Sequence, residues 1–261
     1  MSKFIEPKVF LVGESTVNEQ GLQDFLSHIG VAEWSSDANS DAEMLTEVYG
    51  RMCYKSFGTD LNPNITRVRA TNDAYISNII EKGDGSVLEH GVVNFFFCDV
   101  SRVFTHELVR HRVGTAISQE SLRYVRLTDM NGYLPVCIQE NDQAMSLFAR
   151  TFEELSNLQK EMADVFDLDN MSSFDDKKKI TSAMRRLAPI GLATNIGWST
   201  NFRNLRHVIE MRTAPWSEEE IRKVFAKVAE IAVSRWGNLF ADYDVSMVDG
   251  LPYYTTKNSK V

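Results

Sequence analysis

The stretch Leu108–Leu127, LVRHRVGTAISQESLRYVRL, carries the strongest signal in the sequence. It places Arg110, His111, Arg112, Arg123 and Arg126 within seventeen positions, with hydroxyl and amide side chains between them. The chain as a whole has a formal net charge of −8, so this basic stretch stands out. A local excess of cations on an acidic protein indicates a pocket for a small anion. Phosphate is the expected anion, because the guanidinium fork matches its oxygens.

Length and composition predict a single globular domain. The chain has 261 residues, 43% of them hydrophobic, which is enough for a sizeable core. It contains no apolar run of the ~18 residues that a membrane span requires, and its first residues do not resemble a signal peptide. We therefore expect a cytoplasmic protein without a membrane partner. A pI near 5.2 argues against a general nucleic-acid binder.

The cysteines and histidines indicate neither disulfides nor a metal site. Cys53, Cys98 and Cys137 are odd in number and far apart, so we expect three reduced, mostly buried thiols. The pair His106-Glu107 begins like a zinc-binding HExxH motif, but position 110 is arginine, which cannot bind zinc. No motif of the GxGxxG, GxxxxGK or GxSxG type occurs.

Hydrophobic periodicity predicts one α+β domain, helix-rich, with a small mixed or antiparallel sheet. Strands are expected at 8–12 and 92–100, and helices at 21–29, 40–52, 72–82, 101–112, 144–166, 173–188, 201–212 and 217–231. Ser40 with Glu43, and Ser217 with Glu220, have the spacing of helix caps. Residues 32–41 are expected to form a loop, and residues 257–261 a disordered tail.

The order of residues in the basic stretch resembles a known signature. Arg110-His111-Arg112, a spacer, and then Ser121-Leu122-Arg123-Tyr124 is similar to the RHR…S-x-R-Y motif of the flavin-dependent thymidylate synthases, the ThyX family. In that family seven residues separate RHR from the serine. This chain has eight, Val113–Glu120, so its spacer has one extra residue.

Four other segments agree with this resemblance. Residues 50–56 resemble the family's early segment near the flavin, and residues 83–90 resemble its G-H-x-S/T-x-x-E-H segment. Arg185 within residues 184–189 matches a phosphate-binding arginine, and Asn201, Arg203, His207 and Arg212 match the spacing of the family's Asn-x-Arg helix. The resemblance covers about residues 45–230, within a single domain over 1–261. Residues 1–40 form an N-terminal extension to which it assigns no role.

The resemblance implies a function. The family reductively methylates dUMP to dTMP, with methylenetetrahydrofolate as carbon donor, NADPH as reductant and FAD as cofactor. A methyltransferase of this kind needs no protein nucleophile, because the cofactor carries the chemistry. None of the cysteines lies in a cationic motif that would lower its pKa. The family forms homotetramers with active sites shared between subunits, and we expect the same here.

Site roles follow from the motif match. Cofactor binding is expected of Ser86, Arg110, His111, Arg112, Gln119, Asn201, Arg203 and His207. Binding of the pyrimidine nucleotide is expected of Glu107, Arg110, Gln119, Glu120, Ser121, Leu122, Arg123, Arg185 and Arg212, with Arg123 and Arg185 on the phosphate. The catalytic positions are Arg212 and Ser121. Arg212 would stabilise charge that develops on the uracil ring, and Ser121 would act through hydrogen bonds, since no adjacent base activates it.

Four positions depart from the family pattern. Asp84 replaces a common histidine, Glu107 a common glutamine, His207 an asparagine and Trp216 a histidine. A carboxylate cannot stack like an imidazole, so Asp84 is expected to alter the pocket for the folate. An ionised Glu107 is expected to pair with Arg110. These changes motivate the hypothesis that the reaction type is kept while the nucleotide or carbon donor differs.

Other interpretations remain open at this stage. One keeps the chemistry but acts on another pyrimidine nucleotide, as a UMP methylase or hydroxymethylase. Another is a non-catalytic nucleotide- or RNA-binding protein, which predicts no bound flavin and a steep salt dependence. The third is an oligomeric structural protein, which has no use for so many arginines in one stretch. The sequence does not separate dUMP from UMP, or NADPH from NADH.

Overall fold

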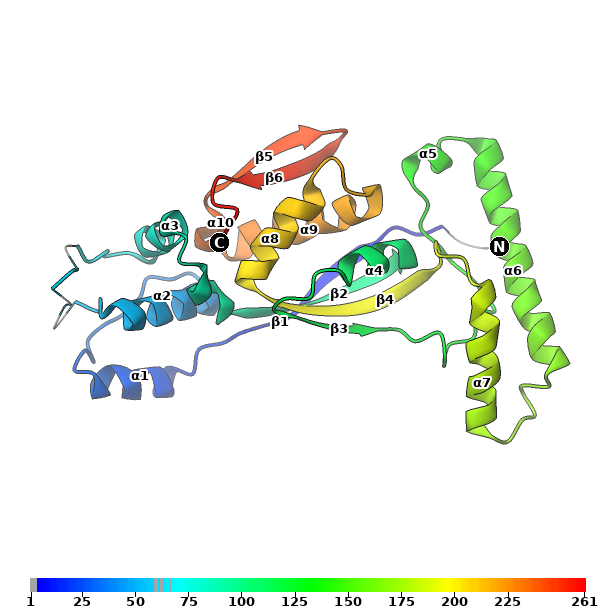
Figure 1. The fold of residues 1–261 in the computed structure, drawn as a ribbon, viewed down its shortest axis with the longest axis horizontal. Coiled ribbons are helices and arrows are strands. Elements are labelled where there is room, and N and C mark those ends of the chain that lie inside the picture. The colour runs from blue at the N-terminus through cyan, green and yellow to red at the C-terminus, as the bar shows by residue number, and fades with distance from the viewer. Residues whose placement is uncertain (1–3, 59–60, 62, 66) are drawn as a thin grey trace.

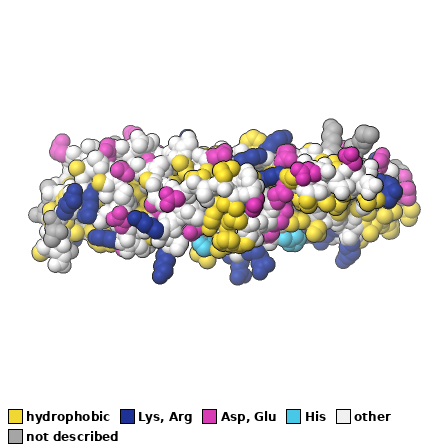
Figure 2. Space-filling model, turned by 90° about the horizontal axis from the view of Figure 1, so that it is seen from above, with side chains coloured by type: hydrophobic (Ala, Val, Ile, Leu, Met, Phe, Trp, Pro, Cys, Tyr) yellow, Lys and Arg dark blue, Asp and Glu magenta, His cyan; other side chains and the backbone are white. Residues whose placement is uncertain are grey.

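A computed structural model describes residues 4–58, 61, 63–65 and 67–261. The molecule is elongated, with a sheet in the middle and helices at both ends and above it (Figure 1). Charged side chains of both signs are interspersed over the face seen in Figure 2, so the net charge of −8 is not gathered in one patch there. In the described part of the chain, no helix is long and apolar enough to cross a membrane.

The central sheet has four antiparallel strands in the order β1-β2-β4-β3. Their bounds are Lys8–Glu14 for β1, Val92–Ser101 for β2, Thr115–Gln119 for β3 and Ala193–Asn201 for β4. In the β2–β4 pair, Val92 lies opposite Asn201 and Ser101 lies opposite Ala193. A second sheet is the hairpin of β5, Tyr243–Val248, and β6, Leu251–Thr256.

The helices form three groups around the sheet (Figure 1). At one end lie α1, Glu19–His28; α2, Asp41–Tyr54; α3, Asn72–Lys82; and the 3-10 turn η1, Gly85–Glu89. Over the sheet lie α4, Arg102–Leu108; α8, Phe202–Thr213; α9, Glu219–Arg235; and α10, Gly237–Phe240. At the other end lie α5, Val136–Gln139; α6, Asp142–Val165; α7, Phe174–Met184; and η2, Arg185–Leu187.

The main core lies between the sheet and the helices above it. Phe97 of β2 packs edge-on against Phe104 of α4, and Trp198 of β4 packs edge-on against Phe225 of α9. Aromatic pairs of this geometry stabilise a core beyond the area that they bury. A smaller cluster around Phe152 of α6 includes Leu127, Met130 and Leu192. The helical end that carries α6 and α7 therefore has its own apolar support.

Most predicted elements are confirmed, and their caps explain their bounds. The predicted helix 72–82 has the observed bounds of α3, which begins after the cap Thr71 and ends at Gly83 in the left-handed conformation (φ 78°). Ser40 caps α2 by accepting the amide of Glu43. The carboxylate of Glu43 accepts the Ser40 hydroxyl and the amide of Asn238, so its second contact joins α2 to α10.

Several predictions are wrong. The helix expected over 101–112 ends at Leu108. The cap of α9 is Glu218 and not Ser217: the Glu218 carboxylate accepts the amides of Glu220 and Ile221, and the Ser217 hydroxyl donates to the carbonyl of Met211. Two thiols are exposed, Cys53 and Cys137. The strands β3, β4, β5 and β6 were not predicted; in β4, for example, two of the four buried positions hold threonine, so the apolar alternation is weak.

The end of the chain also differs from the prediction, because a buried ion pair holds it. Arg206 of α8 is fully buried and forms two hydrogen bonds with Asp242, at 2.8 and 2.9 Å. Its Nε donates to the carbonyl of Val261, whose side chain is buried. Burial alone would raise the pKa of Asp242, but hydrogen bonds from Arg206 and Thr256 lower it to about 2.

Replacing Asp242 by Ala should therefore destabilise the fold by about 3 kcal/mol, because it leaves a buried guanidinium without its counter-charge. Urea unfolding of the variant and the parent measures the difference. The matched control is Asp176→Ala, which removes an exposed carboxylate that contacts Ser173 and Lys179 in the first turn of α7 and should lower the free energy of unfolding far less. Equal effects of the two variants would contradict this role of the buried pair.

Candidate functional site

The antiparallel pairing of β2 and β4 sets the position of two helices that carry predicted site residues. β2 ends at Ser101, where α4 begins, and β4 ends at Asn201, where α8 begins. Because the strands run in opposite directions, these helices start at opposite ends of the pair. Their last turns approach each other, and residues 105 positions apart in the sequence come into contact there.

A buried carboxylate fixes the start of α4. Glu220 accepts the backbone amide of Ser101 at 2.6 Å and also its hydroxyl, and that hydroxyl accepts the amide of Phe104. Burial raises the pKa of Glu220 to about 7, although the hydrogen bonds from Ser101 act in the opposite direction. The first turn of α9 therefore anchors α4 and, through it, the residues that follow.

Arg212 lies at the centre of the site. Its Nη1 donates to the carboxylate of Glu107 at 2.6 Å and its Nη2 to the Glu107 carbonyl at 3.2 Å. Its Nε donates to Nε2 of His111 at 2.7 Å. The expected pairing of Glu107 with Arg110 is therefore wrong, since Glu107 pairs with Arg212. Arg110 is nevertheless close enough to act on the charge of Arg212, whose pKa is lowered first by burial.

His111 is a neutral hydrogen-bond acceptor in this arrangement. Its side chain is buried, and the ring of His207 meets it edge-on at 6.5 Å between centroids. Burial, followed by the charges of Arg212 and His207, lowers the pKa of His111 to about 4. An imidazole that accepts a hydrogen bond from arginine cannot also carry a proton at that nitrogen. His111 thus orients the guanidinium of Arg212 near neutral pH.

A second group of predicted residues lines one pocket. Asn201, Arg203 and His207 border a cavity of about 220 Å³, together with Glu89, Val113, Asn204, Lys260 and Val261. Arg203 donates to Glu89 at 2.6 Å. It also lies so close to Gly85 that a Cβ there would be 2.9 Å from its Nε. The absence of a side chain at position 85 lets η1, with Ser86, approach α8 closely.

A third group lies around the end of β3. Gln119 donates to the hydroxyl of Thr105 at 3.1 Å, and the carboxylate of Glu120 accepts the backbone and side-chain nitrogens of Asn195. The carbonyl of Glu120 accepts Nη2 of Arg102 at 3.1 Å. The contacts of Gln119 and Glu120 thus fix the end of the motif stretch to α4 and β4.

Arg102 is a site residue that the sequence analysis missed. Its Nε is buried and has no hydrogen-bond partner among the described residues. Burial, together with the nearby charge of Arg185, lowers its pKa, while Glu120 acts in the opposite direction. Two neighbouring guanidinium groups with an unused buried donor favour an anion between them. A cation directly after the best predicted strand was the available signal.

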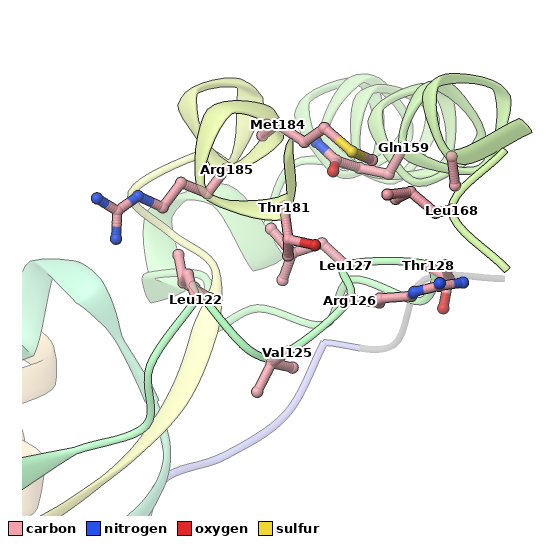
Figure 3. A pocket seen from close by; sticks show the side chains of 11 residues that line it. Leu122, Val125, Arg126, Leu127, Thr128, Gln159, Leu168, Thr181, Met184 and Arg185 are labelled. Atoms are coloured by element: carbon pink, nitrogen blue, oxygen red, sulfur yellow. The ribbon is translucent and has the colours of Figure 1, made fainter. Parts of the chain in front are cut away.

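The remaining motif residues lie in the loop after β3. Ser121 accepts the amide of Arg123 with its hydroxyl, and Leu122 lines a small apolar pocket against α7. Figure 3 shows the guanidinium of Arg185 pointing away from this pocket, on the side opposite Arg126. Arg126 is paired with Asp169 at 2.6 Å, so its charge is compensated. Arg185, in contrast, lies close enough to Arg102 for its charge to act on that guanidinium.

The three residues of the RHR segment, Arg110, His111 and Arg112, lie in different environments. His111 is buried, whereas Arg110 and Arg112 are exposed in the turn between α4 and β3. Near this turn, Gly114 has a positive φ of 66°, and its carbonyl accepts the amide of Asn201. In the described residues no group of three His, Cys, Asp or Glu side chains could hold a metal ion.

Asp84, one of the departures from the motif, has a defined partner. The hydroxyl of Tyr54, at the end of α2, donates to its carboxylate at 2.6 Å. This hydrogen bond, with burial, raises the pKa of Tyr54 to about 12. The segment 83–90 and the segment 50–56, both singled out by the sequence analysis, therefore meet through this pair.

Comparisons with known proteins agree with this arrangement. The family model of the Thymidylate synthase complementing protein matches residues 36–236. The flavin-dependent thymidylate synthase of Corynebacterium diphtheriae is 33% identical over 220 residues, which are 83% of this chain and 85% of the relative. The enzyme of the same name from Mycolicibacterium gilvum is 34% identical over 233 residues, covering 86% and 88%.

Solved structures share the fold. The UMP/dUMP methylase PolB from Streptomyces cacaoi, bound with 5-Br dUMP, aligns with a TM-score of 0.62 at 15% identity, over 92% of this chain and 95% of that one. Thymidylate Synthase X from Helicobacter pylori, with FAD and dUMP, aligns with a TM-score of 0.55 at 17% identity, over 89% and 99%.

The state of His111 predicts a pH dependence of stability. Its pKa in the folded chain, about 4, lies below the ordinary 6.5. The neutral ring therefore contributes stability that is present above pH ~6.5 and is lost as the pH falls toward ~4, by at most about 2 kcal/mol after allowance for solvent screening. Urea unfolding between these pH values should show that the free energy of unfolding falls less with decreasing pH in His111→Asn than in the parent. The same pH slope in His111→Asn and in the parent would contradict this role of the ring.

Proposed function

The chain belongs to the Thymidylate synthase complementing protein family, and from this premise we propose that it is an FAD-dependent thymidylate synthase that reductively methylates dUMP to dTMP. We propose methylenetetrahydrofolate as its carbon donor and NADPH as its reductant. The observation that carries the proposal is the contact of Arg212 with Glu107 and His111, because it joins two separate motif segments in one site.

The geometry of Arg212 suits it to bind the pyrimidine and stabilise its charge. A guanidinium has five N–H groups, and Glu107 and His111 occupy three of them. Two remain for a ligand, one on each terminal nitrogen. A cation held in place before the ligand arrives stabilises negative charge on the uracil ring without reorganising. Ser121 would contribute hydrogen bonds to the same ligand.

The residues near α8 fit a flavin. The pocket of about 220 Å³ offers a cation, an amide and an imidazole from Arg203, Asn201 and His207. The exposed Arg110 and Arg112 would meet the diphosphate, and Ser86 and Gln119 would add hydrogen bonds. When bound, FAD supplies the hydride chemistry that this site has no side chain to perform.

The nucleotide phosphate is assigned to a group of arginines. Arg185 and Arg123 were expected from the motifs, and Arg102 adds a buried, unused donor beside Arg185. A phosphate accepts several charge-assisted hydrogen bonds, so it would relieve the repulsion between these cations. Leu122 and Glu120 would form the edge of the same site.

We infer a homotetramer with shared active sites. The long helix α6 exposes large apolar side chains, Leu147, Phe148, Leu158 and Val165, on an arm that extends from the sheet (Figure 1). Exposed apolar surface of this extent on one helix supports an interface between subunits. Light scattering of the purified protein measures the assembly directly.

An absorbance spectrum of the purified protein tests the proposed activity first. We expect flavin bands near ~450 nm that bleach with NADPH, followed by dTMP formation from dUMP and methylenetetrahydrofolate. Faster turnover of UMP than of dUMP would assign the chain to the alternative pyrimidine nucleotide. A protein that takes up no flavin, yet binds RNA with steep salt dependence, would contradict the proposal.

Replacing Arg102 by Ala should weaken dUMP binding about tenfold or more, because a charge-assisted hydrogen bond to the phosphate is lost. Binding of deoxyuridine, which has no phosphate, should not change. The matched control is Arg186→Ala, an exposed neighbour of Arg185 whose guanidinium donates to the carbonyl of Ser182. Calorimetric titration of both ligands into each variant gives the comparison, and equal losses for the two ligands would argue against a phosphate role.

A further inference from the structure

A small basic pocket lies away from the site described above, between the end of α2, α3, residue 65 and residues 67–69. Its volume is about 40 Å³, which exceeds the ~10–15 Å³ that a single water occupies. It is lined by Arg51, Tyr54, Ser56, Ile65, Arg67, Val68, Arg69, Tyr75, Asn78 and Lys82. Four of these side chains are cationic, and none is acidic.

One of the four cations is structural. Arg51 is buried and pairs with Glu47 at 2.6 Å, and its remaining donors reach the carbonyls of Ser56 and Arg69. It also lies over the ring of Tyr75 at 4.6 Å. These contacts hold the two chain segments that form the pocket walls, so the pocket exists before any ligand arrives.

The other three cations have no acidic partner within ion-pair distance among the described residues: Arg67, Arg69 and Lys82. Lys82 lies over the ring of Tyr54 at 5.8 Å, and the guanidinium of Arg69 donates to the carbonyl of Arg67 at 3.4 Å. In a chain with a net charge of −8, three cations that no described carboxylate pairs with, gathered around one cavity, attract an anion.

Two buried hydroxyls line the same pocket. The side-chain oxygens of Ser56 and Tyr75 form no hydrogen bond of good geometry with a described residue, and these residues are 6% and 4% exposed. Ser56 lies near Tyr75 and acts to lower its pKa, but burial prevails and raises that pKa to about 12. The weak contact between the two hydroxyls leaves most of their hydrogen-bonding capacity unused, so a ligand oxygen could accept from them.

The pocket is connected to the proposed flavin site. Tyr54 lines it and donates to Asp84, the residue that precedes Gly85 and Ser86 of η1. Gly85 in turn contacts Arg203 of the flavin pocket. A ligand that reaches the flavin along η1 would bring its far end toward the three cations.

We propose that this pocket binds the anionic end, phosphate or carboxylate, of a second substrate whose other end reacts at the flavin. The assignment of that substrate rests on the proposed function. The proposed reductant carries phosphates and the proposed carbon donor carries glutamate carboxylates, and both suit cations with two hydroxyl donors. The chemistry of the pocket is shared by these two sources, so the experiment separates them.

The first experiment tests the pocket without reference to catalysis. Protein saturated with FAD and dUMP is titrated with inorganic phosphate at constant ionic strength, and its thermal unfolding is followed. Phosphate should raise the midpoint, and about tenfold more phosphate should be needed in Ser56→Ala, Tyr75→Phe and Lys82→Gln. Lys178→Gln, which removes an exposed cation on α7, is the control and should behave as the parent.

The hydroxyl variants separate a binding role from a structural one. Removing either hydroxyl should change the stability of the unliganded protein little, since only the weak contact between Ser56 and Tyr75 is lost. A binding site therefore predicts unchanged basal stability together with a weaker phosphate effect. A phosphate effect equal in all variants, or absent from the parent, would overturn the proposal. If flavin does not bind, the same titration on the flavin-free chain still tests the pocket.

Steady-state kinetics then identify the substrate. If the anion is a phosphate of the reductant, Lys82→Gln should raise the KM for NADPH about tenfold, and that for methylenetetrahydrofolate should stay constant. If it is a glutamate carboxylate, the KM should rise for the folate and more for its polyglutamate form. In both cases kcat should change little, since the pocket is remote from the reacting atoms. Unchanged KM values for both substrates would overturn the assignment to a second substrate.

Discussion

The antiparallel pairing of β2 with β4 is the constraint on which the site depends. Because of it, α4 and α8 begin at opposite ends of one strand pair, and their last turns converge over the sheet. Only this convergence brings Arg212 to Glu107 and His111. Core aromatic residues pack the helices against the sheet, as Trp198 of β4 does with Phe225 of α9. The carboxylate of Glu220 accepts the amide of Ser101 and so fixes the start of α4. A shift of one residue in the register of β4 would turn its buried side chains, Trp198 among them, to the other face of the sheet and would displace the start of α8.

Local sequence signals account for the elements that were predicted well. The helix α3 begins after Thr71 and ends at Gly83, because a hydroxyl cap and a left-handed glycine act within a few residues of the helix ends. The same reasoning failed for β4, whose alternating burial mixes threonine, serine and asparagine with a few large apolar residues. Its identity as a strand comes from two neighbours distant in sequence, which no local window contains.

The site shows the same division. Motif spacing was sufficient to nominate Arg212, Glu107 and His111, but not to give their partners. The sequence suggested that Glu107 pairs with Arg110, three residues away on a predicted helix. The helix ends at Leu108 instead, so that spacing no longer places the two side chains on one face. Arg102 was missed because its importance lies in an unused buried donor, which only the three-dimensional arrangement reveals.

Compensation distinguishes the arginines that hold the fold from those that are available to ligands. Arg51 and Arg206 are buried, and each has a carboxylate together with backbone carbonyls that use its donors. Burying such a charge is tolerable only when it is paired, and each of these two residues uses four of its five N–H groups in this way, which leaves little capacity for a ligand. Arg212 is intermediate, since Glu107 and His111 fix it but leave donors free. Arg102 has a buried donor without a partner in the part of the chain that the structure describes, a condition that a bound phosphate would relieve. The anion sites proposed for this acidic chain are thus the places where folding leaves guanidinium groups incompletely paired among the described residues.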